Sequence, residues 1–568
     1  MSYLHSPRLV FSGQFQADPS TVNNDPTHFD NTTFQPNYQD YGKGQDNGWW
    51  NPDGTGNWRL IGCQVVSITY KDGSTTNDPS IDPIIGLSLT DTDSRVAGKI
   101  VDLDSQQQMV SELWGVIVRL VSGDTNLFIG DYQTAAFTNI WMTRSPALRG
   151  DSCAAAIYQS VIKNLKWDLG KFNSRYLNEL HEVSPEQLSI QFTVDRFNMT
   201  HDDPQFSLGR IAGSIGPYFE GKPLHWLPGR QLFPVPNPKY NYAVALLDEQ
   251  LKTLILDMGN AFQFDEKGDL LSGKNLIVAV KTDNPSKTEY IYFGKIDNSS
   301  PGWYAQTAGI VTFQLTEEIL SLLKSHPLAI FDNNPTFDFP ELAFQEKTSY
   351  VRADQFVTRL NAGETFEVSL TATYLGKPLP GAIINLVQST SAFGPTPPVV
   401  STPENAISFP SSAKTDEYGN ASISVQASDP GNPREYIDGQ IYGIVYKLEK
   451  QNYTDLNPSD FVSLMVYSSV PESTIQHPDW ERDIQPIMQQ YANLYPLMSK
   501  GIFNLADKDV VHNNAEILSF VFGKELTDPN YMPATRDLSA GKQRMILRYL
   551  ETILSGQQAK TSVTFKRL

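Results

Sequence analysis

Residues 197–232 read FNMTHDDPQFSLGRIAGSIGPYFEGKPLHWLPGRQL and hold two of the eight histidines, a pair of aspartates and two strings that resemble catalytic motifs. The run before them, Leu188–Val194, alternates apolar and polar residues, as a strand with one buried face does. The stretch itself is rich in proline, glycine and aromatic residues, which favours strands and turns over a helix. We therefore expect it to be central to the packing of a β-rich first domain.

Both motif-like strings lack an essential position. Gly216–Lys222 (GPYFEGK) has the spacing of a phosphate-binding loop, but the next residue is Pro223, which supplies neither the hydroxyl for magnesium nor a backbone N–H. Ala212–Gly216 (AGSIG) is one residue away from a nucleophile elbow, but Pro217 follows where that motif requires a helix. The sequence therefore disfavours nucleotide binding at this string and acyl transfer by Ser214.

The same stretch carries the densest cluster of candidate metal or ligand contacts. The candidates are His201, Asp202, Asp203, His225 and Arg230. Pro204 permits the sharp turn that three consecutive ligands would need, so a metal site stays open, but a hydrogen-bonded loop between strands is the more frequent use of such residues. For Arg230 the alternatives are a bound carboxylate and an internal ion pair, and the ion pair is the more frequent.

A second candidate site lies in the long polar segment Asp18–Asn57. Its candidate residues are Asn23, Asn24, Asp25, His28, Asp30, Trp49 and Trp50. They suit calcium, another ion or a sugar-like ligand on a tryptophan platform. The alternative is a set of Asx turns with aromatic side chains tucked into the body, which we favour because no EF-hand spacing is present.

Composition and charge limit the classes of binding partner that the chain can have. The 568 residues carry a formal net charge of −19, which disfavours nucleic acid and anionic membranes because both repel an acidic surface. The two cysteines, Cys63 and Cys153, build neither a disulfide framework nor a thiolate zinc site. A protein partner, a small molecule and a carbohydrate-like ligand remain open, and the sequence identifies no cofactor.

No targeting or membrane segment is apparent. The start, MSYLHSPRLVFSG, lacks a basic region followed by an apolar one, and the apolar runs are far shorter than a membrane helix. We expect a soluble protein without membrane insertion, either cytoplasmic or exported by a signal-independent route.

The chain divides into three predicted parts, 1–345, 346–470 and 471–568. Strand-like runs bounded by turn residues dominate the first, together with an amphipathic helix over Ser152–Leu165 and a short helix over Thr316–Lys324. In the last part the 3.6-residue pattern predicts three helices, at 480–494, 512–522 and 539–555. The predicted fold class is mainly β with a helical C-terminal part.

The middle part has short strands at regular spacing and two turn signals, PLPGA at 378–382 and TDEYGNA at 415–421. These turns resemble bacterial immunoglobulin-like modules, and the strand spacing agrees with a β-sandwich. Modules of this kind usually space or bind, and they seldom catalyse.

Several segments together carry a family resemblance. They are PRLVFSGQF, STVNND, GNWRLIGCQVVSITYKDG, RFNMT, GSIGPYFEGKPLHWLPGRQL, YPLMSKGIFNLAD and YMPATRDLSAGKQRMILRYL, in this order along the chain. They resemble the N-terminal half of the violacein-pathway iminophenylpyruvate dimer synthase and chromopyrrolate synthase family, which implies shared architecture and a bacterial secondary-metabolism context.

In that family the oxidative coupling of indole imines is attributed to a following ferritin-like domain. This sequence ends at Leu568, where that domain would begin, and has no pair of Glu-x-x-His motifs. The resemblance therefore transfers no catalytic residue to this chain.

Three functions follow as alternatives. We favour a non-catalytic binding or scaffold protein that partners a separate oxidase or takes a ligand, because each enzyme motif lacks an essential position. The second is a metal-assisted oxidoreductase acting on a small aromatic acid near His201. The third is an exported effector or surface ligand-binding protein without a signal peptide.

Overall fold

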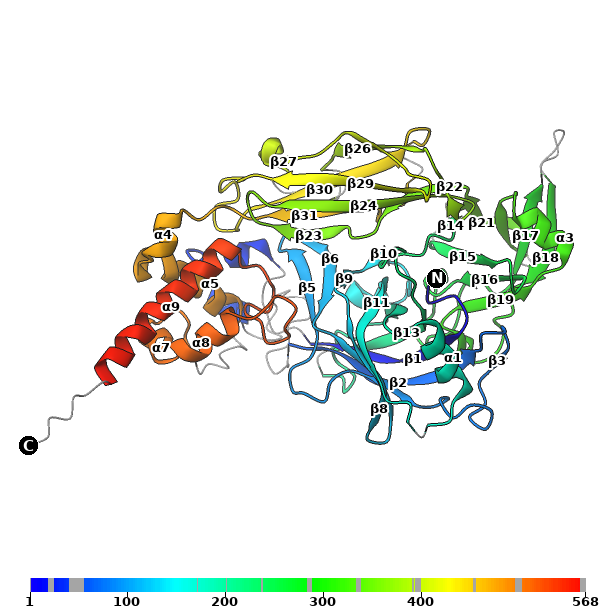
Figure 1. Cartoon of the computed structure of the whole chain (residues 1–568), viewed down its shortest axis with the longest axis horizontal. Coiled ribbons are helices and arrows are strands. Elements are labelled where there is room, and N and C mark those ends of the chain that lie inside the picture. Colours follow the sequence, from blue (N-terminus) through cyan, green and yellow to red (C-terminus); the bar gives the residue numbers. More distant parts are fainter. Residues whose placement is uncertain are drawn as a thin grey trace, which may run out of the picture.

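The computed structural model describes residues 2–18, 25–39, 56–170, 172–200, 202–235, 239–282, 289–333, 339–390, 393, 400–452, 456–495 and 503–561. It confirms the predicted fold class, since strands dominate and the helices gather in the C-terminal part (Figure 1). No helix of the described segments is long and apolar enough to cross a membrane.

The first sheet closes on itself because its first strand pairs on both sides, with β13 and with β2. In spatial order its strands are β1 (Arg8–Ala17), β13 (Leu208–Pro217), β12 (Leu188–Asp195), β11 (Ala155–Trp167), β8 (Thr125–Tyr132), β7 (Ile117–Ser122), β4 (Ser88–Thr90), β2 (Trp58–Thr69) and β3 (Thr75–Thr76), with β10 (Thr138–Trp141) paired to β11. Stacked aromatic rings of Phe15, Trp58 and Phe192 fill its core. Helix α1 (Arg175–Val183) adds buried apolar residues to this core.

The AGSIG string is part of strand β13, which pairs with β1 and β12. A Cβ on Gly213 would lie 2.3 Å from the carbonyl oxygen of Gln191, closer than any side chain tolerates. The glycines of this string therefore serve close strand packing, and the predicted strand-and-turn character of the stretch is what the structure has.

The predicted helix over Ser152–Leu165 is wrong, because Ala155–Trp167 is strand β11. It pairs with β12 at one edge and β8 at the other, and every residue of 155–162 except Ile157 is buried, on both faces of the strand. A register shift between Lys163 and Lys166, with Asn164 at a φ of 54°, interrupts the two-residue alternation. A bulged strand buried on both faces imitates the spacing of an amphipathic helix.

The second sheet packs beside the first. Its spatial order is β18 (Glu289–Lys295), β17 (Leu276–Thr282), β20 (Leu328–Asp332), β21 (Glu341–Lys347), β14 (Arg230–Pro234), β15 (Ala243–Asp248), β16 (Thr253–Asp257) and β19 (Ile310–Gln314). The helices α2 (Trp303–Thr307) and α3 (Glu317–Leu323) cover part of its core. The α3 helix confirms the prediction at Thr316–Lys324, and Thr316 caps it through a bond to the Ile319 N–H.

Beyond this sheet, two five-stranded sheets share one apolar core. One contains β22 (Ser349–Ala353), β24 (Thr365–Tyr374), β29 (Asn420–Ala427), β27 (Ile407–Ser408) and β25 (Lys377–Pro378); the other contains β23 (Val357–Leu360), β31 (Phe461–Val466), β30 (Gln440–Leu448), β26 (Ile383–Gln388) and β28 (Ser412–Lys414). A small sheet of β5 (Lys99–Asp104), β6 (Gln107–Trp114) and β9 (Ala135–Ala136) packs against this sandwich.

The C-terminal helices form a separate apolar cluster at one end of the molecule (Figure 1). They are α4 (Glu472–Gln476), the π-helical turn Trp480–Ile484, α5 (Gln485–Leu494), α7 (Lys508–Asn513), α8 (Ala515–Phe522) and α9 (Ala540–Thr561). The short 3-10 turns elsewhere are Pro26–Phe29, Pro36–Gln39, Gly150–Cys153 and Glu404–Ala406. Pro486 lies in the opening turn of α5, the only place in a helix that suits it.

Candidate functional site

The aspartates of the predicted HDD cluster lie in the turn between β12 and β13. Asp202 is exposed, and the Asp203 carboxylate accepts a bond from the Gln205 N–H at 2.8 Å. His201 lies outside the described residues.

His225 is buried, and its ring contacts the Gln159 carbonyl at 3.3 Å, level in the sheet with Ser214. Ser214 lies six residues, roughly 20 Å along the strand, beyond Leu208, where the turn with the aspartates ends and β13 begins. The structure therefore does not bring His225 to Asp202 and Asp203. Among the described residues no three histidine, cysteine, aspartate or glutamate side chains gather as a metal site would require.

Arg230 makes a two-pronged ion pair inside the second sheet. Its Nε and Nη2 lie 2.8 and 2.6 Å from the two carboxylate oxygens of Glu346. The remaining donors reach the carbonyls of Leu323 at 3.0 Å and His326 at 2.6 Å. Every nitrogen of this guanidinium is used, which leaves none for a ligand.

The serine of the elbow-like string has a structural contact. Ser214 is fully buried in β13, and its hydroxyl lies 2.9 Å from the Tyr3 carbonyl and 2.8 Å from the Leu9 carbonyl. Past Pro217 the chain turns without forming a helix, and the Tyr218 hydroxyl donates to the Lys222 carbonyl at 2.7 Å. Neither motif-like string has the strand–turn–helix geometry of its model.

In the described part of the polar segment 18–57, aspartate side chains accept hydrogen bonds from residues close by in the sequence. Asp25 accepts from the Thr27 N–H and hydroxyl, and Asp30 accepts from those of Thr32. His28 is buried and stacks on Tyr38 at 4.3 Å between ring centroids. Asn23, Asn24, Trp49 and Trp50 lie outside the described residues, so their predicted role as a platform stays a prediction.

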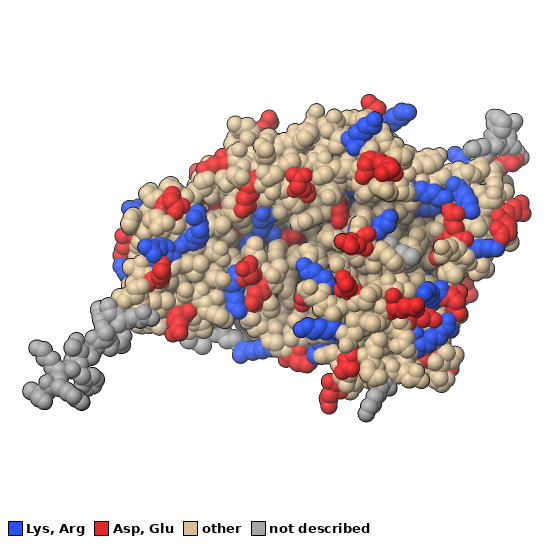
Figure 2. Space-filling model, in the orientation of Figure 1, with Lys and Arg blue, Asp and Glu red and all other residues tan. Residues whose placement is uncertain are grey.

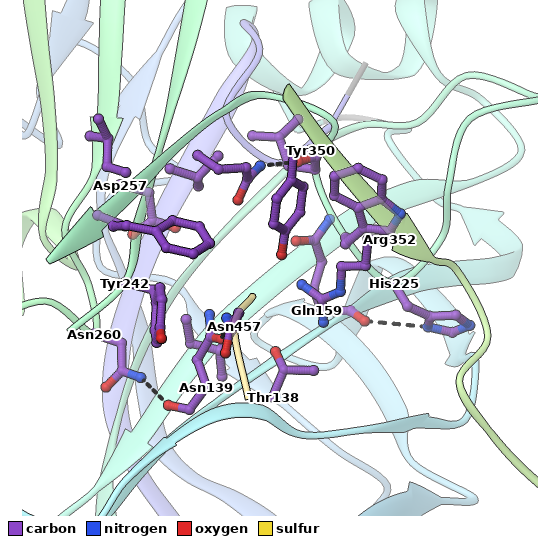
Figure 3. A pocket seen from close by; sticks show the side chains of 18 of the residues that line it. Thr138, Asn139, Gln159, His225, Tyr242, Asp257, Asn260, Tyr350, Arg352 and Asn457 are labelled. Carbon is purple, nitrogen blue, oxygen red and sulfur yellow. Dashed lines mark hydrogen bonds between the residues drawn. The ribbon is translucent and has the colours of Figure 1, made fainter. Parts of the chain in front are cut away.

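A different site emerges where the two large sheets meet the sandwich. We call it the junction pocket, and residues from all three surround it (Figure 3). The first sheet supplies Thr138 and Gln159, the second Tyr242 and Asp257, and the sandwich Tyr350, Arg352 and Asn457. His225 and Trp226, from the opening stretch, also line it.

Hydrogen bonds around the pocket connect the two large sheets and the sandwich to one another. The Asn457 amide donates to the Asn139 side-chain oxygen at 2.6 Å, and Asn260 donates to the Asn139 carbonyl at 2.8 Å. The Tyr3 hydroxyl donates to Asp257 at 2.7 Å. These contacts connect the walls of the pocket to one another.

Arg352 is the one cationic side chain that lines the described pocket. Its Nε lies 3.4 Å from Oδ1 of Asp460, and the other carboxylate oxygen of Asp460 accepts a short bond from the Tyr350 hydroxyl. Figure 3 shows the side chain reaching toward the middle of the pocket among Tyr350, Gln159 and Asn457. Its Nη2 is buried and has no hydrogen-bond partner among the described protein atoms, and the same is true of the Trp226 Nε1.

Burial shifts the titration of the groups around the pocket. It raises the pKa of the Asp257 carboxyl and of the Asp460 carboxyl, the latter against the opposing effect of Arg352. Burial also lowers the pKa of the His225 imidazole, against the opposing effect of Asp354, so His225 is neutral at physiological pH. Arg352 is thus the only cation of the pocket lining in the described structure at that pH.

No sequence pattern points to Arg352, Tyr350 or Asn457 as site residues. They lie on segments that show only strand and turn patterns, and the pocket forms when those segments meet residues more than a hundred positions earlier. His225 and Arg230 were singled out instead, and of these only His225 lines the pocket.

No protein-family model matches the chain. A curated relative, the 2-imino-3-(indol-3-yl)propanoate dimerase of Chromobacterium violaceum, is 32% identical over 88 residues. The match covers 14% of this chain and 8% of that protein, less than a tenth of its length. It supports a loose relationship to a violacein-pathway imine dimerase.

Solved structures give only faint similarity. A two-domain protein of unknown function from Bacteroides fragilis is 13% identical over 22% of this chain and 46% of its own, with a TM-score of 0.17. The adhesin InvE of Yersinia pseudotuberculosis is 16% identical over 40% and 55%, with a TM-score of 0.15. Domains 4 and 5 of the S-layer protein SbsC are 8% identical over 40% and 90%, also with a TM-score of 0.15. Superpositions of this quality carry no argument about function.

Proposed function

We propose that this chain is a non-catalytic binding or scaffold protein, related to the N-terminal part of the indole imine dimerases, in which three parts are held as one body. The observation that carries the proposal is a set of buried ion pairs at the seams between the parts. Such pairs are costly to open, because separation leaves a charge unpaired in a low-dielectric environment.

Two of these ion pairs join the small sheet to the sandwich. Arg434 donates two hydrogen bonds, of 2.8 and 2.9 Å, to the Asp104 carboxylate, and both side chains are almost fully buried. Arg359 makes a short bond to Glu112 and donates to the Asp102 carbonyl at 2.8 Å. Planar guanidinium groups suit such two-pronged contacts, which set orientation as well as distance.

A third buried ion pair lies within the first sheet, and its arginine also donates hydrogen bonds to the second. Arg144 lies 3.3 Å from Asp195 of β12, and it donates to the Gly259 carbonyl and the Asn260 side chain beyond β16. Arg210 adds a two-pronged pair to the same Asp195, at 2.8 and 2.6 Å. The first sheet is thereby attached to the second through fully or largely buried charges.

The segment 25–39 attaches the N-terminal part to the C-terminal helices. Phe29 is buried in the helical core, and its carbonyl accepts from Gln490 at 2.8 Å. Asn31 donates to the Pro486 carbonyl and Gln39 to the Asn493 carbonyl, both at 2.8 Å. Segments more than four hundred residues apart in sequence thus close the body.

The outer surface suits recognition of a protein rather than of nucleic acid. The chain carries a net charge of −19, and Figure 2 shows acidic and basic side chains mixed over the face in view. We propose a separately encoded oxidase as the partner, by analogy with the dimerases. The boundaries near 345 and 470 and an immunoglobulin-like middle part belong to the same proposal.

The experiment is a direct assay of the purified chain with 2-imino-3-(indol-3-yl)propanoate, generated in place by an amino-acid oxidase. We expect the imine to decay at the same rate with and without the chain, and no dimer to form. Dimer formed by the chain alone, and lost in a His201→Ala, Asp202→Ala double variant, would establish the oxidoreductase alternative instead. Retention of the oxidase on immobilised chain, with no loss of its activity, would support the scaffold role.

A further inference from the structure

A lysine, an asparagine and an aspartate lie in one row where the first sheet meets the small sheet. The antiparallel register of β1 and β2 continues one residue past β1, since the Asp18 N–H donates to the Asn57 carbonyl at 3.0 Å. On the other side Trp58 bridges Gly98 in antiparallel register, which sets Asn57 opposite Lys99. Residues opposite one another on antiparallel strands project from the same face. The side chains of Asp18, Asn57 and Lys99 are therefore neighbours.

The Lys99 amine contacts the side-chain amide of Asn57 inside the protein. Its Nζ lies 2.5 Å from the Asn57 Oδ1. Adding a carbonyl bond of about 1.23 Å to this 2.5 Å contact limits the distance from Nζ to the Asn57 Cγ to about 3.7 Å. Atoms poised to react are about 3–3.5 Å apart, so the amine and the amide carbon are close to a reactive arrangement. Asp18, Asn57 and Lys99 are only 3%, 2% and 7% exposed, which keeps competing water away.

Burial turns Lys99 into a nucleophile near neutral pH. Desolvation lowers the pKa of the Lys99 amine to about 7, and the positive charges of Arg536 and Arg59 act in the same direction. The Asp18 carboxylate acts against them, as an acidic group near the amine does. At pH 7 about half of the amine is therefore unprotonated. Only this form has the lone pair that attacks a carbonyl carbon.

The surroundings of Asn57 favour attack on its amide carbon. Its Oδ1 also accepts from the Ala97 N–H at 3.0 Å, so a backbone donor is in place for the negative charge that develops on this oxygen. Its Nδ2 donates to the Arg95 carbonyl at 2.9 Å. Residues 93–95 are exposed, so the amide nitrogen is on the side of a surface loop, where a leaving group can depart.

We propose that Lys99 and Asn57 form an intramolecular isopeptide bond, with Asp18 as the proton carrier. The Lys99 Nζ attacks the Asn57 Cγ; the Nζ–Cγ bond forms and the Cγ–Nδ2 bond breaks. Asp18 takes one proton from Nζ and gives it to Nδ2, which leaves as ammonia, and no oxidant or reductant takes part. The bond joins the first sheet to the small sheet covalently, whether or not the chain binds an oxidase.

Intact mass spectrometry of the purified full chain tests the proposal. We expect a mass lower than that of the sequence by one ammonia. Digestion with trypsin then yields a peptide in which the segment that ends at Arg59 is joined to the segment that contains Lys99. The joined peptide locates the bond, because ammonia lost by succinimide formation at an asparagine joins no two segments.

Two variants remove the reacting groups one at a time. Lys99→Met removes the amine, and Asp18→Asn removes the proton carrier and keeps the shape of the side chain. We expect both variants to have the full mass of their sequences and to yield no joined peptide. The first measurement uses the unmodified chain, so it does not depend on how well the variants fold.

A second amine–amide contact in the same chain is the internal control. The Lys163 Nζ also lies 2.5 Å from the side-chain oxygen of Gln133, but both residues are only half-buried. We expect Lys163 and Gln133 to stay unjoined in the digest, because burial is what makes the Lys99 amine reactive.

Three results would overturn the proposal. An unmodified chain of full mass, without the joined peptide, shows that Lys99 and Asn57 only share a hydrogen bond. A bond formed as completely in Asp18→Asn as in the unmodified chain removes Asp18 from the reaction. A joined peptide of Lys163 and Gln133 shows that contact without burial is sufficient.

Discussion

Arg230 and Arg352 are two buried arginines with buried carboxylate partners, and they differ in how much of the guanidinium is used. Arg230 gives two nitrogens to Glu346 and two bonds to carbonyls. Arg352, a residue of the junction pocket, has one nitrogen 3.4 Å from Asp460, while its Nη2 has no hydrogen-bond partner among the described residues. Burial and an ion pair are common to both arginines, so neither feature marks a residue as a binding one. What differs is the number of hydrogen bonds that each guanidinium makes.

The largest effect is expected at the fully used arginine. Arg230→Met leaves the Glu346 carboxylate, with 0% exposed side-chain surface, without its cation. We expect the free energy of unfolding to fall by about 3–5 kcal/mol, as for other broken buried ion pairs. Urea denaturation measures it, and an Arg230→Met, Glu346→Gln double variant should recover part of the loss. A loss below about 1 kcal/mol would show that the pair contributes little to the stability of the second sheet.

A smaller loss is expected at the partly used arginine. In Arg352→Met, Asp460 keeps its bond from Tyr350, and burial already raises the pKa of this carboxyl, so it can take up a proton. We expect a loss of about 1–3 kcal/mol in the same denaturation experiment. If this variant costs as much as Arg230→Met, the distinction between the two arginines fails.

Asp102 extends the comparison to a buried carboxyl that pairs with no arginine side chain in the described structure. Its contribution to stability depends on pH. Asp102 accepts from the Ser111 hydroxyl at 2.5 Å, and burial raises its pKa from 3.8 to about 7. The folded protein therefore binds a proton more tightly than the unfolded chain. Its contribution is fully present below the unfolded pKa and is lost as the pH rises through about 7.

We expect Asp102→Asn to flatten the decline in unfolding free energy between pH 5 and pH 8, because the amide does not titrate. The measurement is the difference between variant and unmodified protein at each pH, so that other titrating groups cancel. If the variant shows the same decline of unfolding free energy with pH, a group other than Asp102 causes it.

The smallest effect is expected at the serine of the AGSIG string. Ser214→Ala removes a buried hydroxyl that donates to a backbone carbonyl, which costs about 1 kcal/mol of unfolding free energy. Thermal unfolding measures the loss, and Ser12→Ala, on the neighbouring strand β1, is the matched control. Any loss of partner or ligand binding beyond this destabilisation would give Ser214 a role that a strand residue does not have.

Sequence patterns located the β-rich body, the C-terminal helices and the short helix near Thr316, because each depends on local periodicity and capping. The same periodicity failed at β11, where burial of both faces and a bulge remove the alternation of a strand. Local pattern is informative where one face of an element is buried, and misleads where both are.

The candidate site was less accessible from sequence. Consecutive residues such as Asp202 and Asp203 attract attention because they are adjacent, yet a ten-residue strand separates them from His225. The junction pocket joins Gln159, Asp257 and Arg352, which are spaced by about a hundred residues each. Such a constellation depends on how the sheets dock, and a single sequence carries no signal of that docking.

The most direct test of the difference between Arg230 and Arg352 is urea denaturation of Arg230→Met and Arg352→Met under the same conditions. The account predicts the larger loss of unfolding free energy for Arg230→Met, because that substitution leaves the Glu346 carboxylate without its cation. Equal losses, or a larger loss for Arg352→Met, would contradict it.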